Sequence, residues 1–143
     1  MIVMNKIKAQ DIADMIDHSL LNPTFTMDEI RRGCEIAKEY KCISVCLRPS
    51  DVEFASEILK GSDVLITTVI GFPHGSNLTE VKVYETKMAI EQGCVEVDVV
   101  LNIGRLLSGD YDYVENMLTS SVPKSKPHLA ELNKKALSIG YSL

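Results

Sequence analysis

Four short apolar runs alternate with helical patterns between residues 16 and 118 of the chain. In the intervening segments, apolar residues recur at the three- and four-residue spacing of one helix face. Strands that alternate with helices in this way predict βαβ units and a parallel sheet. We therefore expect an α/β fold with strand order 1-2-3-4 and a short helix before the first strand. The predicted strands are residues 16–21, 42–47, 64–72 and 94–103.

The predicted helices carry recognisable boundary and core signals. Thr26 with Glu29 three residues later forms a capping box, which predicts that the first long helix begins there. After Gly104 we expect a polar loop and then a short helix near residues 111–118. The third long helix has an apolar stripe that predicts its core-facing side, formed by Val81, Tyr84 and Met88.

Four consecutive βα units could form either a small doubly wound sheet or half of a (β/α)8 barrel. The side chains of the fourth apolar run distinguish these two architectures. One face of this strand carries Glu96 and Asp98, which a flat parallel sheet covered by helices on both sides does not accommodate easily. The interior of a barrel accommodates them, because its upper end holds the active site. The sequence therefore predicts parallel (β/α) units forming the N-terminal half of a TIM (β/α)8 barrel, about four βα units. The opposite face is apolar and should pack under helices, through Val95, Val97, Val99 and Leu101.

Composition and charge narrow the classes of function. The chain has 143 residues, of which 45% are hydrophobic and 24% charged, as in one ordinary globular domain. A net charge of −5 disfavours nonspecific binding to nucleic acid or to an anionic membrane. Without a long apolar run or a signal-peptide pattern, we expect no membrane span, a cytoplasmic location and reduced cysteines. The spacing of cysteines and histidines argues against a structural zinc site, and we expect no metal or cofactor.

Three polar residues on the predicted strands are candidates for chemistry. Asp98 lies in mid-strand, where a carboxylate is either an active-site acid or base or a buried, hydrogen-bonded structural group. Asp17 is predicted at the same level of the sheet, as part of a proton relay or as an ordinary residue at a strand end. Cys46 faces inward, and the role of a small buried residue is favoured over that of a reactive thiol.

Five segments, in order and spacing over about residues 12–118, resemble deoxyribose-phosphate aldolase. One of them is the loop Gly71-Phe72-Pro73-His74-Gly75, which follows the third strand where barrel enzymes place their active sites. Ser19 stands where the family often has Thr. The resembling segments are residues 17–21, 43–46, 68–75, 96–104 and 108–111.

The resemblance implies a class I aldolase on a TIM barrel. Such an enzyme cleaves 2-deoxyribose 5-phosphate to glyceraldehyde 3-phosphate and acetaldehyde through a lysine Schiff base, without a metal. By resemblance, Asp98 is the proton-relay carboxylate and Asp17 supports it. Cys46, Val69 and Phe72 then line or support the pocket for the small phosphosugar. The reactive lysine, a second lysine that tunes it and most of the phosphate site belong to later strands of the family.

The last part of the chain departs from the family. We expect a partial aldolase domain at residues 1–118 and a divergent tail at 119–143, with one helix near 128–139 and no fifth strand. The lysines, including Lys82, fall on predicted helices, helix ends or the tail, where we expect exposed, protonated amines. A truncated gene model, a frameshift or a splice product would each give such a chain.

These observations predict a chain that is inactive by itself and self-associates through exposed sheet edges. Two alternatives stay open. One is a non-catalytic binding or assembly module built on the half-barrel. The other is a small complete α/β protein with unrelated chemistry, such as a phosphosugar isomerase.

Overall fold

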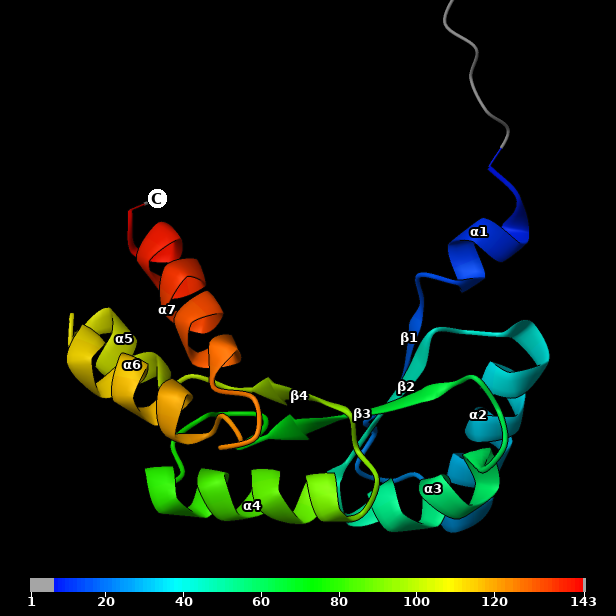
Figure 1. Cartoon of the computed structure of the whole chain (residues 1–143). Coiled ribbons are helices and arrows are strands. Elements are labelled where there is room, and N and C mark those ends of the chain that lie inside the picture. The colour runs from blue at the N-terminus through cyan, green and yellow to red at the C-terminus, as the bar shows by residue number, and fades with distance from the viewer. Residues whose placement is uncertain (1–6, 143) are drawn as a thin grey trace, which may run out of the picture. The chain divides into compact units, whose positions relative to one another are not determined.

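The computed structural model describes residues 7–142 and shows four parallel strands that alternate with helices (Figure 1). The strand order is β1-β2-β3-β4, which confirms the predicted fold class and order. The strands are β1 (Asp17–Leu20), β2 (Ser44–Leu47), β3 (Leu65–Ile70) and β4 (Glu96–Val99). The helices are α1 (Ala9–Ala13), α2 (Met27–Tyr40), η1 (Pro49–Asp51), α3 (Val52–Leu59), α4 (Thr79–Glu91), α5 (Ile103–Leu107), α6 (Tyr111–Ser120) and α7 (His128–Tyr141).

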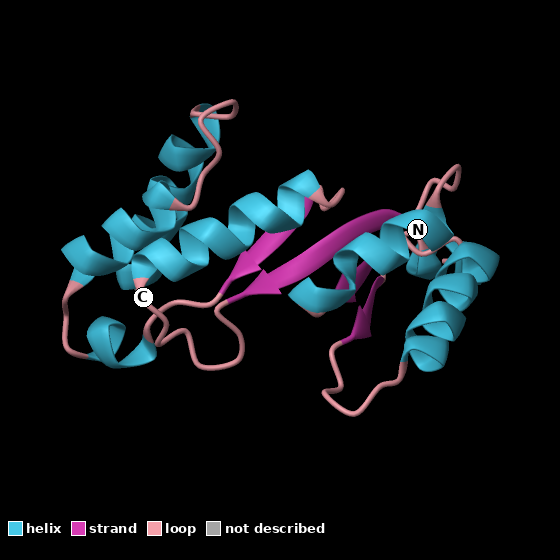
Figure 2. Ribbon diagram, turned by 90° about the horizontal axis from the view of Figure 1, so that it is seen from below, coloured by secondary structure: helices cyan, strands magenta, loops and turns pink. Residues whose placement is uncertain are grey.

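The chain divides into two compact units, and both β3 and β4 run from one unit into the other. The first unit contains the chain up to Thr68 together with residues 89–97. The second contains residues 69–88 and the chain from Asp98 onward. Figure 2 distinguishes the helices and strands of these segments by colour.

The first unit has a continuous apolar core between its strands and the neighbouring helices α2 and α3. Val45 and Leu47 of β2 are completely buried in this core. The capping box at the start of α2 is confirmed, because the Thr26 amide donates to the Glu29 carboxylate at 2.7 Å and the Glu29 amide donates to Thr26 Oγ1 at 3.3 Å. The two helices contribute buried apolar residues to this core, namely Ile30, Cys34, Ala37, Val52, Ala55 and Leu59.

In the second unit the tail helix α7 packs against α6. Lys134 Nζ lies 2.9 Å from the Glu115 carboxylate, and this hydrogen bond raises the pKa of Lys134. The rings of Tyr111 and Tyr141 stack with centroids 4.1 Å apart. The predicted helix near residues 128–139 is thus confirmed, and it extends to Tyr141.

The predictions for residues 94–110 were partly wrong. The fourth strand was expected to reach Ile103, but β4 ends at Val99, and helix α5 begins at Ile103 where a polar loop was expected. The cause is local, because the Asn102 side chain accepts a hydrogen bond from the Arg105 amide at 3.1 Å and caps a helix. Val95 precedes the strand and is 53% exposed, so it does not belong to the predicted buried face.

The predicted core stripe of α4 was also wrong. Val81 and Tyr84 are 47% and 64% exposed, and the buried residues of this helix are Lys82, Thr86 and Ala89. The pattern rule places apolar side chains inward and lysine outward, whereas here a charged residue has buried hydrogen-bond acceptors.

Within the described residues, none of the helices combines the length and apolar character that crossing a membrane requires.

Candidate functional site

Asp17 is the first residue of β1, and its carboxylate is held by hydroxyl groups of β2 and β3, the next two strands of the sheet. Ser44 Oγ of β2 donates to Asp17 Oδ1 at 2.6 Å. Thr67 Oγ1 of β3 lies 3.1 Å from each carboxylate oxygen. Ser44 and Thr67 are buried, whereas Asp17 is exposed to solvent. The hydroxyls therefore fix the orientation of a carboxylate that solvent or a ligand can reach.

Cys46 lies on β2, where it pairs in register with Ser19 of β1 and is 5% exposed. Arg48, the cation nearest to it in sequence, is bound elsewhere. Its Nε donates to the Asp51 carboxylate, and its two Nη groups donate at 3.1–3.2 Å to the backbone carbonyls of Asn22, Pro23 and Phe25. The guanidinium thus ties together the loops that follow β1 and β2. A substrate-pocket role for Cys46 stays a prediction.

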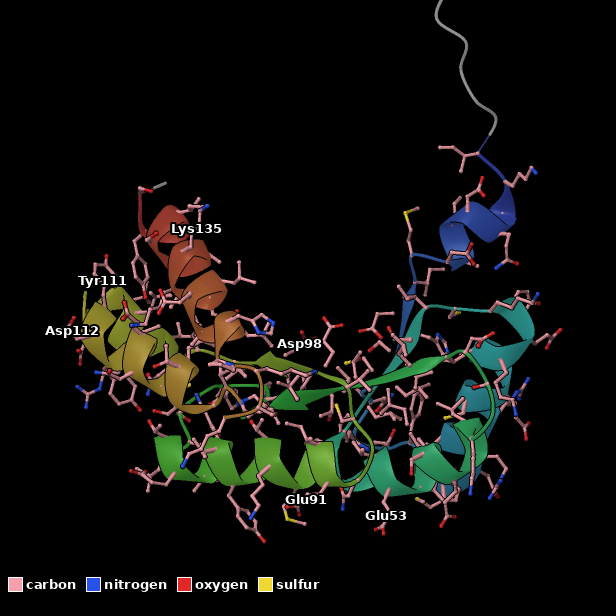
Figure 3. All side chains as sticks on the ribbon, viewed as in Figure 1. Glu53, Glu91, Asp98, Tyr111, Asp112 and Lys135 are labelled. Carbon is pink, nitrogen blue, oxygen red and sulfur yellow. The ribbon has the colours of Figure 1, made fainter. Side chains whose placement is uncertain are left out.

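Asp98 lies on β4 and is exposed, on the side of the strand opposite α4 (Figure 3). Val97, the residue before it, is partly buried against the apolar core of the first unit, whereas Asp98 is exposed. The hydrogen-bond register changes along this strand. The Val95 amide donates to the Ile66 carbonyl and the Val100 amide to the Ile70 carbonyl, both at 2.9 Å.

Between these two hydrogen bonds β4 contains one residue more than β3, as in a β-bulge. Bulges are common beside active sites, because the extra residue changes the direction of a side chain. Asp98 lies within the irregular stretch. The bulge was not apparent from the sequence, since the alternation of apolar and acidic residues suggested a regular strand.

The loop after β3 is a tight turn with two glycines in the left-handed region. Gly71 has φ 67° and Gly75 has φ 66°, and the Gly75 amide donates to the Gly71 carbonyl at 2.8 Å. A Cβ atom at Gly75 would collide with the Leu101 carbonyl. The loop exposes Phe72, which is 52% accessible, whereas Val69 at the end of β3 is buried. The loop geometry explains why both glycines are needed.

The predicted site residues are thus divided between the two units. Asp17 and Cys46 lie on adjacent strands of the first unit. Val69, Phe72 and Asp98 belong to the second. That all five line one concave surface stays a prediction.

Ser44 and Thr67 were not among the predicted site residues, although their hydroxyls hold the Asp17 carboxylate. Both are hydroxyl residues on the two strands that follow Asp17 in the sheet, and this is the signal that could have identified them. Ser44 pairs in register with Asp17, whereas Thr67 pairs with Cys46. Lys82 was missed as well, and no sequence pattern marks a lysine whose partners are backbone carbonyls.

Comparison with known proteins identifies relatives of one kind, although no family model matches the chain. A deoxyribose-phosphate aldolase of Caldanaerobacter subterraneus is 48% identical over 118 residues, which are 82% of this chain and 51% of that protein. One from Clostridium perfringens is 47% identical over 129 residues, covering 90% of this chain and 54% of its own. The chain therefore spans about half the length of these relatives.

Solved structures of similar fold are also deoxyribose-phosphate aldolases, and the chain again matches about half of each. A Coccidioides immitis protein described as a candidate deoxyribose-phosphate aldolase matches with a TM-score of 0.78 and 36% identity, over 80% of this chain and 46% of its own. The tetrameric deoxyribose-phosphate aldolase of Aeropyrum pernix matches with a TM-score of 0.65 and 29% identity, over 77% of this chain and 50% of its own. These matches confirm the predicted resemblance and the half-barrel fold class.

We predict that Gly75→Ala destabilises the second unit much more than Gly109→Ala does. Both glycines have positive φ, but a Cβ atom at Gly109 meets nothing within 4 Å. The left-handed conformation alone costs about 1–2 kcal/mol, and overpacking at Gly75 adds about 1–3 kcal/mol. Urea unfolding followed by circular dichroism measures both variants. Equal losses of unfolding free energy would show that the loop does not pack tightly against Leu101.

Proposed function

Because this chain is the counterpart of about half of a deoxyribose-phosphate aldolase, we propose that it carries the acid–base half of that enzyme's catalytic framework. The proposed reaction is cleavage of 2-deoxyribose 5-phosphate to glyceraldehyde 3-phosphate and acetaldehyde. A lysine supplied from outside this chain forms the Schiff base, and the iminium accepts the electron pair when the carbon–carbon bond breaks. Asp98 moves the protons that this step requires.

The observation that carries the proposal is the Asp17 carboxylate held by Ser44 and Thr67. A polar, solvent-accessible cluster on the strands of a parallel sheet is unusual unless the strands line a site. We propose that Asp17 supports the proton relay of Asp98, and that Cys46, Val69 and Phe72 belong to the pocket for the phosphosugar. The bulge in β4 supports a special orientation of Asp98.

Residues 7–142, the part of the chain that the structure describes, offer no suitable nucleophile. A lysine must be neutral to attack a carbonyl, which requires burial or a neighbouring cation. No lysine lies on β1, β2, β3 or β4. Within residues 7–142 only Lys82 is fully buried, and its amine already donates to two carbonyls. Acid–base help alone contributes about 10²–10⁴-fold, against 10⁶-fold or more for whole enzymes. We therefore propose that the isolated chain is inactive.

We predict that co-expression with the C-terminal half of the Clostridium perfringens aldolase gives measurable cleavage of 2-deoxyribose 5-phosphate, whereas the chain alone gives none. In the mixed complex, Asp98→Asn should lower turnover by about 10²-fold or more, because a general acid–base group is lost. Asp112→Asn is the matched control, since Asp112 is an exposed residue of α6. Turnover is followed by a coupled assay for glyceraldehyde 3-phosphate.

The relative's own N-terminal half serves as the positive control for assembly. If that half restores turnover and this chain does not, the proposal fails and a non-catalytic binding or assembly module becomes the better interpretation. Turnover that is insensitive to Asp98→Asn would remove Asp98 from the proposed relay.

We also propose that the isolated chain self-associates through β1 and β4, which lie at the two ends of the strand order. Edge strands present unpaired backbone groups, and exposed apolar residues such as Val95 beside β4 favour pairing with another copy. Sedimentation velocity should therefore show species whose size increases with protein concentration. A single sharp monomer that unfolds cooperatively at all concentrations would contradict this prediction.

A further inference from the structure

Lys82 on α4 is a fully buried lysine, with 0% of its surface exposed. Burial lowers the pKa of its amine, while the nearby Glu85 carboxylate acts in the opposite direction. A buried ammonium group is unfavourable unless acceptors replace its water shell. A lysine at this position therefore requires specific hydrogen-bond partners for its amine. Packing of its apolar stem does not explain why the position holds lysine, because an apolar residue would pack there as well.

The partners of the Lys82 amine come from three different segments of the second unit. Nζ donates to the Gly75 carbonyl at 2.7 Å and to the Val100 carbonyl at 2.7 Å. It also lies 3.9 Å from Met117 Sδ of α6. One ammonium group thus contacts the loop after β3, the residues that follow β4, and a helix further along the chain.

The loop is packed against the same helix at its other end. The Gly71 amide donates to the Glu85 carboxylate at 2.8 Å. A Cβ atom at Gly71 would lie 2.7 Å from Lys82 Cε, so the glycine leaves room for the lysine stem. Residues Lys82 and Glu85, three apart on α4, therefore hold the two ends of the Gly71–Gly75 loop.

We propose that Lys82 is a positioning residue, whose ammonium group fixes the Gly71–Gly75 loop to the C-terminal end of β4. The loop carries Phe72 and His74, and β4 carries Asp98 two residues before Val100. Fixing the two segments together sets the position of these side chains relative to one another. The amine is used for hydrogen bonding and is inaccessible, so Lys82 is not a nucleophile. This role does not depend on whether the chain is catalytically active.

The first test observes the ammonium group directly in the unmodified chain. In ¹⁵N-lysine-labelled protein near neutral pH, an ammonium whose protons are donated to buried carbonyls should give a slowly exchanging NζH₃ signal. That signal should be absent from Lys82→Met and present in Lys87→Met, the exposed lysine of the same helix. If all lysine ammonium protons exchange rapidly in the unmodified chain, the proposal is overturned even if the variants do not fold.

The second test measures the positioning effect by amide hydrogen exchange. The Gly75 amide bonds to the Gly71 carbonyl and the Val100 amide to the Ile70 carbonyl. In Lys82→Met both amides should exchange at least about tenfold faster, because a hydrogen bond to a charged donor is lost. In Lys87→Met they should not change. The Ile30 amide of α2 is the internal control for global unfolding and should keep its rate in both variants.

Two results would contradict the positioning role. Unchanged exchange at Gly75 and Val100 in a folded Lys82→Met protein would show that methionine replaces the lysine equally well. Equal acceleration at Ile30, Gly75 and Val100 would show a general loss of stability instead of a local release of the loop.

Discussion

A lysine that forms a Schiff base must be a neutral amine, and near neutral pH only burial or a neighbouring cation makes it so. This constraint decides what the chain can do by itself. Its strands bring carboxylate, hydroxyl and thiol groups into the sheet, but no lysine. Among the described lysines only Lys82 is fully buried, and its amine already donates hydrogen bonds to the carbonyls of Gly75 and Val100. We propose that the chemistry left to these groups is proton transfer and positioning.

Hydrogen bonds from side chains to backbone give the loops their geometry. Arg48 holds the loop after β1 through three carbonyls, and Lys82 holds the loop after β3. In both places a cation binds carbonyl oxygens at the C-terminal ends of strands, where barrel enzymes build their sites. We propose that a framework of this kind orients Asp17 and Asp98.

The order of strands and the α/β class could be predicted from the sequence, because they depend on local signals. Apolar runs predicted the strands, and the Thr26 capping box predicted the start of a helix. The length of β4 and the rotation of α4 did not follow. Asn102 ends the strand region by capping a helix, although the residues around it favour β-structure. On α4, Val81 and Tyr84 of the apolar stripe are exposed and Lys82 is buried, because hydrogen-bond acceptors distant in sequence outweigh the ordinary preference of lysine for solvent.

For the site, residue types on strands identified Asp17 and Asp98 as candidates, and the family resemblance gave them roles. The partners of Asp17 required the register of three strands, which places Ser44 and Thr67 beside its carboxylate. The bulge in β4 required the positions of individual hydrogen bonds. Features of this kind depend on contacts between distant segments, and one-dimensional patterns do not contain them.

We propose that this chain contains the acid–base groups of an aldolase without its amine nucleophile. Borohydride reduction in the presence of acetaldehyde or 2-deoxyribose 5-phosphate, followed by peptide mass mapping, tests it most directly, because reduction makes any lysine imine permanent. We expect only low, scattered labelling of exposed lysines and none at Lys82. Stoichiometric labelling of a single lysine would contradict it and would identify a nucleophile within the chain.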